Sequence, residues 1–182
     1  MKKLFFMILI LAINIGTVFG ATNLKGKNFN INVLKEPDKI ETAEFDSQAG
    51  KIKTWTYRWQ EEDRSIIIAY SLLPKSLVSS LMLEGVCEDF IVETILNPIL
   101  NAGRSVTPMK IENIEEIGMG VKGIDIYCLL NDDRLGVSFC RFRLIMCKNE
   151  VWTIFSISPD HNKINELKEM YNSLRVYPGI II

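Results

Sequence analysis

The sequence predicts a single α+β domain, and two observations lead to this fold class. Several segments between residues 29 and 157 alternate apolar and polar residues or run almost wholly apolar, as strands do. Two other segments, near residues 79–95 and 159–174, place their apolar residues three and four positions apart, which is the spacing of an amphipathic helix. The predicted order is a first group of strands, a long helix, four strands and a closing helix.

The composition fits one globular domain. The 182 residues are enough for an ordinary domain with a hydrophobic core. Hydrophobic residues make up 48% and charged residues 24%, which is too apolar for a disordered chain. The formal net charge of -1 lacks the basic excess of a nucleic-acid-binding domain, so we expect no nucleic-acid partner.

The first 20 residues have the three regions of a secretory signal peptide. Lys2-Lys3 precede an uncharged apolar run over residues 4–15, and the small residues Val18 and Gly20 stand at positions -3 and -1 of a cleavage site. The run is too short for a comfortable membrane span, although an uncleaved anchor is the alternative. We expect cleavage after Gly20, a periplasmic or secreted domain over 21–182, and no stable membrane span after cleavage.

Eight segments are predicted to be strands. The segment Ser65–Leu73 is almost continuously apolar, which is typical of a central strand covered on both faces. Polar turns separate the segments, and Lys148-Asn149 joins the last two into a hairpin. In order, the predicted strands are Phe29–Val33, Glu41–Asp46, Lys51–Gln60, Ser65–Leu73, Val106–Ile117, Lys122–Leu130, Leu135–Met146 and Val151–Ile157.

An aromatic stripe lies on the third predicted strand. Trp55, Tyr57 and Trp59 fall at period two, so they share one face of that strand. Such a stripe is more typical of a sheet face beneath a helix, but it is also a candidate ligand platform.

Two segments are predicted to be helices. The first begins near Ser79 and ends by Pro98, with Gly103 beyond it. Its buried stripe is Leu83, Val86, Cys87, Phe90, Ile91 and Ile95. The last helix is expected to have Ser158 as its N-cap, Pro159 in its first position and a buried stripe of Ile164, Leu167, Met170, Tyr171 and Leu174.

Two arginines lie two residues apart on the strand Leu135–Met146. Arg141 and Arg143 therefore share a face, which we expect to be half-polar, while Cys140 points to the opposite face. Side chains on such a face can contact a partner protein, and the pair is a candidate binding surface.

The pairing of the four cysteines, Cys87, Cys128, Cys140 and Cys147, stays open. They are either small buried hydrophobic residues or, in an oxidising compartment, the source of one disulfide. Cys140 and Cys147 are seven residues apart on one strand and point to opposite faces. Cys128 and Cys140 lie on neighbouring strands, but a turn at Asn131–Arg134 does not place them directly opposite each other.

No set of residues in the sequence predicts a catalytic or metal site. His161 is the only histidine, no GxSxG motif accompanies it, and no cysteines stand at metal-ligand spacing. A hydrolase built around His161 is the weakest of the functional alternatives. The glycines of Gly118–Gly123 do not lie between a strand and a helix start, so they are not expected to bind phosphate. We expect no enzyme activity, no metal and no cofactor.

Three stretches, taken with the element order, resemble the PsbP-like (Mog/PsbP) superfamily. They are GVKGIDIYCLL at 120–130, FCRFRLIMCKNEVWTIFSIS at 139–158 and MYNSLRV at 170–176. The resemblance covers about Phe29 to Val176, and the exported bacterial branch of unknown function fits the signal peptide best. It implies a curved antiparallel sheet sandwiched by helices (α/β/α), and a protein that acts through its surfaces without catalysis.

These observations predict an exported, non-enzymatic module that binds an envelope or extracellular protein not identified by the sequence. The candidate binding surface is Arg141, Arg143, Trp55, Tyr57 and Trp59. The alternative is a carrier of a small molecule or lipid, with its pocket between the sheet and the long helix.

Overall fold

The structure is a computed structural model that describes residues 22–47, 50–75, 104–114, 121–132 and 136–178. These residues form ten strands and two helices. The strands are β1 (Thr22–Gly26), β2 (Phe29–Val33), β3 (Lys39–Ser47), β4 (Gly50–Gln60), β5 (Ser65–Leu72), β6 (Arg104–Ile114), β7 (Lys122–Asp132), β8 (Gly136–Cys147), β9 (Glu150–Ser158) and β10 (Arg175–Val176). The helices are α5 (His161–Asn165) and α6 (Lys168–Ser173).

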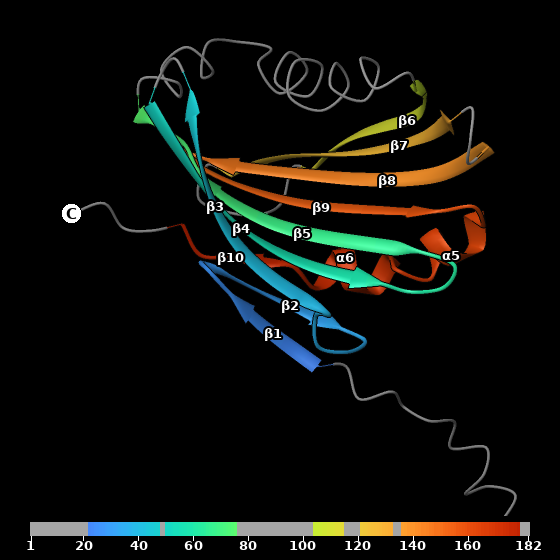
Figure 1. Cartoon of the computed structure of the whole chain (residues 1–182), viewed down its shortest axis with the longest axis horizontal. Helices are drawn as coiled ribbons and strands as arrows, with labels where there is room; N and C mark the ends of the chain where they lie inside the picture. The colour runs from blue at the N-terminus through green and yellow to red at the C-terminus, as the bar shows by residue number, and fades with distance from the viewer. Residues whose placement is uncertain (1–21, 48–49, 76–103, 115–120, 133–135, 179–182) are drawn as a thin grey trace, which may run out of the picture.

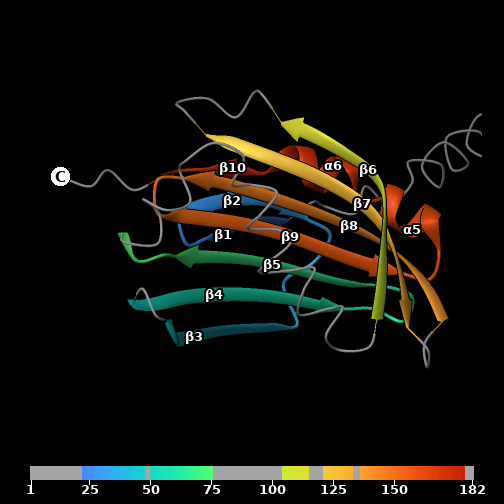
Figure 2. The same ribbon diagram turned by 90° about the horizontal axis from the view of Figure 1, so that it is seen from above.

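Seven strands form one antiparallel sheet in the order β3-β4-β5-β9-β8-β7-β6 (Figures 1 and 2). Within β3-β4-β5 and within β6-β7-β8-β9, each strand pairs with the next one along the chain. The pairing of β5 with β9 joins these two runs, from Ser65 opposite Ile157 to Leu72 opposite Glu150. β9 is therefore the middle strand of the large sheet.

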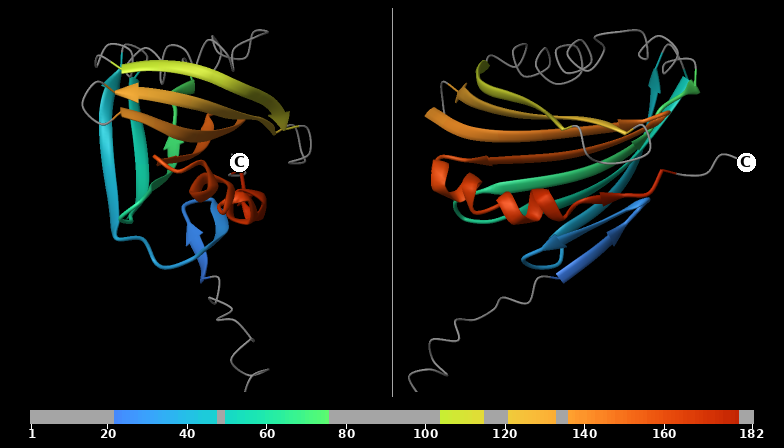
Figure 3. Two further views of the ribbon diagram at one scale, coloured as in Figure 1. Left: turned by 90° about the vertical axis from the view of Figure 1, so that its right-hand side faces the viewer. Right: turned by 180° about the vertical axis from the view of Figure 1, so that it is seen from behind.

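The large sheet is curved, and its concave side holds both helices and a second, smaller sheet (Figure 3). The small sheet is antiparallel and has the order β1-β2-β10. Helix α6 contacts β2, and helix α5 contacts β8 and β9. We call the concave side of the large sheet its inner face and the other side its outer face.

Apolar side chains are buried on both faces of the large sheet. The inner core joins sheet, helices and small sheet, and it contains Phe29, Ile31, Tyr57, Trp59, Ile68, Tyr70, Ile145, Trp152, Ile154, Leu167, Met170 and Tyr171. The outer core contains Leu73, Ile124, Ile126, Cys128, Leu130, Cys140, Phe142, Leu144, Met146 and Val151. The burial of this much apolar surface is the main contribution to the stability of the fold.

The prediction of an α+β fold with a sheet sandwiched by helices (α/β/α) is wrong, because the described residues are mainly β. The layer on the inner face is itself partly a sheet, and helices α5 and α6 have only five and six residues. Strand β1 was missed because its sequence, TNLKG, shows no regular alternation. The antiparallel sheet is confirmed.

The predicted strands from β2 to β9 are confirmed, with changes at their ends. Strand β7 continues to Asp132, two residues beyond its predicted end, where it pairs with Gly136. The last three residues predicted for β6, 115–117, lie outside the described residues. Other predictions lie outside the described residues: the signal peptide, the helix near 79–95, the glycine segment at 118–120 and the C-terminal tail at 180–182.

The last predicted helix is shorter and interrupted. Asp160, and not Ser158, is the N-cap of α5, and its carboxylate accepts a hydrogen bond from the backbone N–H of Asn162. Two turn residues, Glu166 and Leu167, separate α5 from α6. Both keep right-handed helical φ and ψ angles, but the N–H of Leu167 bonds to the backbone oxygen of Ile164, three residues back, which interrupts the α-helical pattern. Ile164 and Tyr171 are buried as the spacing predicted. Neither of the two described helices is long and apolar enough to cross a membrane.

The turn of the β1–β2 hairpin packs closely against the inner face of the large sheet. Asn28 has a φ of 56°, a left-handed conformation that asparagine tolerates better than most residues. The ring of Phe29 lies over Gly26, where a Cβ atom would come within 2.1 Å of the ring. Phe29 in turn meets Tyr57 edge-on, with the ring centres 5.4 Å apart. Only glycine at position 26 leaves room for this packing.

Candidate functional site

The strand registers place all five predicted binding residues on the inner face. Trp55 lies opposite Tyr70, and Tyr70 lies opposite Trp152, which makes one row across three strands. The next two rows begin at Tyr57 and Trp59 and continue across the sheet to Arg143 and Arg141, respectively. The aromatic stripe and the arginine pair therefore belong to one surface of the sheet, which lies beneath the small sheet and the helices.

Arg141 and Arg143 form a buried cluster with Asp125 of β7. Nη2 of Arg141 lies 2.9 Å from Oδ2 of Asp125, and Arg143 donates from Nε to Oδ1 at 2.8 Å and from Nη2 to Oδ2 at 2.5 Å. Arg141 is 4%, Arg143 9% and Asp125 4% exposed. Arg143 thus binds the Asp125 carboxylate in a bidentate manner, the strongest geometry for an arginine–carboxylate pair.

Tyr171 of α6 covers this cluster. Its ring centre lies 4.0 Å from the guanidinium carbon of Arg141 and 5.4 Å from that of Arg143. The Tyr171 hydroxyl donates a hydrogen bond to the backbone oxygen of Arg141 at 2.9 Å and shares another with Ser156 at 2.8 Å. Arg143 also donates to the backbone oxygen of Tyr171. The cluster therefore fixes helix α6 on the inner face.

Charge in the cluster is only partly balanced. Burial alone would raise the pKa of Asp125, but the hydrogen bonds from Arg143 and Arg141 outweigh it and hold that pKa below its ordinary value. Burial raises the pKa of Tyr171, so its phenol stays neutral. One carboxylate faces two guanidinium groups, and Nε of Arg141 is buried with no hydrogen-bond partner among the described residues. The aromatic ring of Tyr171 supplies part of the missing stabilisation.

The structure therefore places the arginine pair away from the solvent. A partner protein cannot reach either guanidinium while α6 is in place, because Tyr171 and the sheet enclose both. Their role in partner binding stays a prediction, and the contacts show a role in joining sheet to helix.

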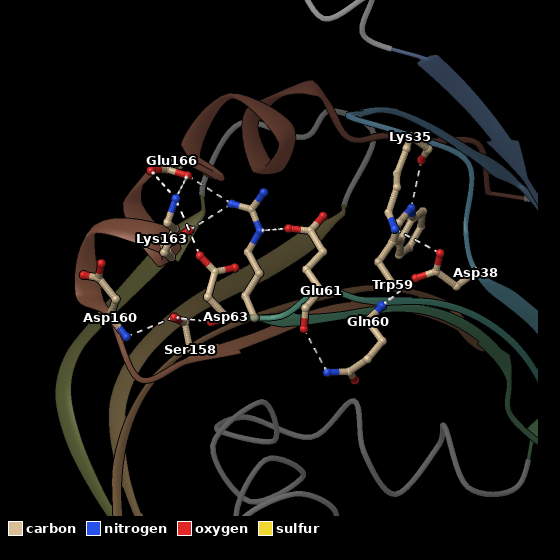
Figure 4. A network of polar contacts seen from close by, with 11 residues as sticks. Lys35, Asp38, Trp59, Gln60, Glu61, Asp63, Ser158, Asp160, Lys163 and Glu166 are labelled. Carbon is tan, nitrogen blue, oxygen red and sulfur yellow. Dashed lines mark hydrogen bonds and ion pairs between the residues drawn. The ribbon is translucent and has the colours of Figure 1, made fainter.

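Tyr57 and Trp59 are also buried in the inner core. The Tyr57 hydroxyl accepts a hydrogen bond from the backbone N–H of Lys27 at 3.1 Å. The indole of Trp59 donates to the backbone oxygen of Lys35 at 2.8 Å (Figure 4). Both side chains thus hold the β1–β2 layer and the segment after it against β4.

A polar network holds helix α5 to the β4–β5 turn (Figure 4). Arg64 contacts Glu61 at 2.5 Å and Glu166 at 3.2 Å, and Lys163 lies 3.6 Å from Asp63. Two acidic residues of this turn, Glu61 and Asp63, are therefore paired with cations of the protein itself. Throughout the described part of the chain, no three histidine, cysteine or acidic side chains gather as a metal site would require.

Trp55 is the one predicted binding residue that is only half-buried and flanked by cations. The ammonium group of Lys53 lies 5.3 Å from its ring centre, and that of Lys27 lies 5.8 Å from it. Lys53 also pairs with Glu44 at 3.5 Å. We call Lys27, Lys53 and Trp55 the Trp55 surface. An indole with two nearby ammonium groups can contact apolar and anionic groups of a partner together.

A hydrogen-bonded trio supports the Trp55 surface from below. Tyr70, whose ring centre is 5.3 Å from that of Trp55, donates to Glu150 at 2.6 Å. Asn28, in the β1–β2 turn, donates to the same carboxylate oxygen at 2.5 Å. Burial, and then the neighbouring carboxylate, raise the pKa of Tyr70, so its hydroxyl keeps its proton. The trio ties the turn that carries Lys27 to β5 and β9.

His161 is exposed at the first residue of α5. Its ring lies 5.1 Å from that of Phe139, and its Nδ1 is 3.3 Å from the Asn165 side chain. These neighbours include no nucleophile or carboxylate that would make the imidazole a general base. The long helix expected to form one wall of a carrier pocket lies outside the described residues.

Sequence reasoning missed Asp125 and the part that Tyr171 plays. A signal for Asp125 was present: it is the one acidic residue within the apolar run GIDIYCLL, next to a strand with two arginines on one face. Buried charges are almost always paired, so an aspartate in such a run predicts a cationic partner on a neighbouring strand.

Comparisons with known proteins support the fold. No family model and no curated protein matches the sequence. The solution structure of cyanobacterial PsbP (CyanoP) from Synechocystis sp. PCC 6803 is similar, with a TM-score of 0.55 and 13% identity over 89% of this chain and 96% of that one. PA94, a protein of unknown function from Pseudomonas aeruginosa, matches at 8% identity over 72% of this chain and 91% of the other, but its TM-score of 0.41 carries no argument. The chain therefore has a PsbP-like fold.

Proposed function

We propose that this chain is an exported, non-catalytic module that binds another protein through the Trp55 surface. The observation that carries the proposal is the placement of the Trp55 indole between two lysine ammonium groups, 5.3 and 5.8 Å from its ring. Tryptophan is the residue type most enriched among binding hot spots, and it is most effective when a rigid frame holds it. The row Trp55-Tyr70-Trp152 and the Tyr70–Glu150–Asn28 trio form such a frame.

The chemistry of this surface favours a partner segment with acidic residues beside an apolar or aromatic one. Lysine side chains attract the carboxylates of a partner as it approaches, and the indole provides apolar contact area in the complex. The non-catalytic part of the proposal is supported by the placement of the chemically versatile side chains. Arg141, Arg143 and Asp125 are occupied in packing. The side chains described next to His161 belong to Phe139 and Asn165, and neither is a nucleophile or a carboxylate.

Export is supported by the charged, apolar and small-residue regions of residues 1–20. Protein recovered from outside the cytoplasm should begin at Ala21, as its intact mass would show. Recovery of a chain that retains residues 1–20 would contradict cleavage without bearing on the Trp55 surface.

Site-specific photocrosslinking tests the binding surface. A photoreactive amino acid replaces Lys53 in the full chain, expressed in its own host, and a second variant carries it at Lys168, an exposed position on α6. We expect a discrete crosslinked protein from position 53 and none from position 168.

Charge reversal with the purified crosslinked partner completes this test. Lys27→Glu with Lys53→Glu should weaken binding at least tenfold, or about 1.4 kcal/mol, and the loss should shrink at high salt. Lys168→Glu is the matched control, and all variants should keep the same melting temperature because exposed ion pairs contribute little to stability. Equal crosslinking at both positions, or unchanged affinity after charge reversal, would reject the Trp55 surface.

A further inference from the structure

Cys128 and Cys140 stand directly opposite each other on β7 and β8. The sequence prediction that they would not be opposed is wrong. It centred the turn on Asn131–Arg134, whereas the strands continue until Asp132 pairs with Gly136, which shifts the register. Both cysteines belong to the outer core, so their side chains point to the same side of the sheet.

From this register we propose that Cys128 and Cys140 form a cross-strand disulfide when the protein folds under oxidising conditions. Directly opposed residues of an antiparallel pair have Cα atoms about 4.5 or about 5.5 Å apart, depending on their hydrogen-bonding class. Both separations fall within the range of about 4.4–6.8 Å that disulfides adopt. The bond therefore forms without any change of strand pairing.

The surroundings of the two sulfur atoms favour the same reaction. Both thiols are free in this structure. A hydrogen bond between them lowers the pKa of Cys128. The same contact, with burial, raises the pKa of Cys140. The thiolate that forms first is stabilised by the hydrogen bond from the other thiol, so either cysteine can attack an oxidant while its neighbour acts as the resolving thiol. A disulfide also suits the apolar outer core, because it replaces two weakly polar S–H groups.

The oxidant is a disulfide, either of a small thiol such as glutathione or of a thiol oxidoreductase. One of the two thiolates, for example that of Cys128, attacks one sulfur of that disulfide, forms a mixed disulfide and expels one thiolate. The Cys140 thiolate then attacks the Cys128 sulfur and expels the second thiolate. Two protons and two electrons leave the cysteine pair, and the oxidant is reduced to two thiols.

Burial decides when this exchange takes place. Cys128 is 8% and Cys140 3% exposed, so an oxidant reaches them before the outer core closes. Cys147 does not compete for either sulfur, because it belongs to the inner core on the other side of the sheet. The remaining rival is Cys87, which lies outside the described residues, and the experiment must separate it. This inference does not depend on the Trp55 surface.

The test is refolding followed by a count of free thiols. The full chain is reduced, unfolded and refolded with glutathione disulfide, and a thiol-blocking maleimide then labels it under denaturing conditions. We expect two labels on the refolded protein against four on the reduced protein, and a linked peptide pair containing Cys128 and Cys140. Cys87→Ser and Cys147→Ser should each keep the link and lose one label, whereas Cys140→Ser should lose the link and show three labels.

The melting temperature gives a second measurement. The oxidised wild-type protein should melt about 5 °C above the reduced protein, because the link restricts the unfolded chain, and Cys140→Ser should show no such difference. Four labels on the refolded wild-type protein would overturn the inference. So would a linked peptide that contains Cys87.

Discussion

The two faces of β8 are equally buried but are built from different chemistry. Every residue from Cys140 to Cys147 is buried. The outer face presents Cys140, Phe142, Leu144 and Met146 to an apolar core, whereas the inner face presents Arg141, Arg143, Ile145 and Cys147. Burial therefore does not decide which residue types a strand can carry.

The residues on the neighbouring strand β7 decide which residue types each face of β8 can carry. Asp125 of β7 lies opposite Arg143 and meets both guanidinium groups, while on the outer face Ile126 of β7 lies opposite Phe142. A buried charge is tolerated only where its partner is fixed at hydrogen-bond distance, and a buried apolar side chain needs only a matching shape. The inner face should thus be more sensitive to the loss of one polar group, and the outer face to the loss of volume.

Removal of Asp125 is expected to have the largest effect. Asp125→Ala leaves two arginines buried without their carboxylate, so the free energy of unfolding should fall by about 3–5 kcal/mol. Urea denaturation followed by circular dichroism measures this loss. Asp46→Ala, at an exposed position on edge strand β3, is the control and should change stability by less than about 0.5 kcal/mol. A loss below about 1 kcal/mol for Asp125→Ala would show that the cluster is not a stabilising unit.

On the outer face, Leu144→Ala should cost about 3 kcal/mol. Leu144 is almost fully buried, so truncation removes apolar contacts and leaves a cavity. The same urea experiment applies, with Val137→Ala on the exposed start of β8 as the matched control. If Leu144→Ala cost no more than Val137→Ala, the outer face would not be a packed core.

Acid should weaken the inner face selectively. The pKa of Asp125 is held down in the folded state, so its stabilising effect is complete above the unfolded value of about 3.9 and is lost as the pH falls through the folded value. Wild-type stability should therefore decline below about pH 4, by up to about 1.4 kcal/mol per pH unit from this group. The stability difference between wild type and Asp125→Asn should narrow over the same range. A difference that is constant from pH 7 to pH 2.5 would contradict the depressed pKa.

Loss of the Tyr171 hydroxyl should have the smallest effect of the four. Tyr171→Phe keeps the ring over the guanidinium groups but removes the bonds to Ser156 and to the backbone oxygen of Arg141. The expected cost is about 1 kcal/mol, measured as before against Tyr177→Phe at an exposed position. A loss as large as that of Asp125→Ala would mean that the hydroxyl, and not the ion pair, holds the helix on the sheet.

Strands could be predicted where the burial of one face produces an alternation of apolar and polar residues. The alternation of Trp55, Tyr57 and Trp59 predicted that they share a face, and the structure places all three on the inner face. Two kinds of feature could not be predicted. The α-helical hydrogen-bond pattern is interrupted between α5 and α6 although the apolar spacing runs through both helices, because spacing reports only which side is buried. Strand β1 shows no regular alternation, unlike β2, which has the same length, and its pairing with β2 depends on the turn at Lys27-Asn28.

The sequence predicted which residues share the candidate site, but it did not predict that the two arginines are buried. The face shared by Arg141 and Arg143 followed from period two, yet their burial depended on Asp125, Tyr171 and a helix that arrives from elsewhere in the chain. The pairing register of β7 and β8 also could not be predicted from the sequence. The opposition of Cys128 and Cys140 changes if the turn between their strands moves by a residue or two, and turn residues alone do not fix that position.

Strand β2 has one neighbour from each end of the described chain. It pairs with β1 a few residues before it, and its other edge pairs with β10, where Val176 lies opposite Phe29. During synthesis the ribosome must therefore deliver nearly the whole chain before the small sheet can be completed and α6 can cover the arginines. Until then the inner core stays open, and a growing chain holds its N-terminal strands without their last partner.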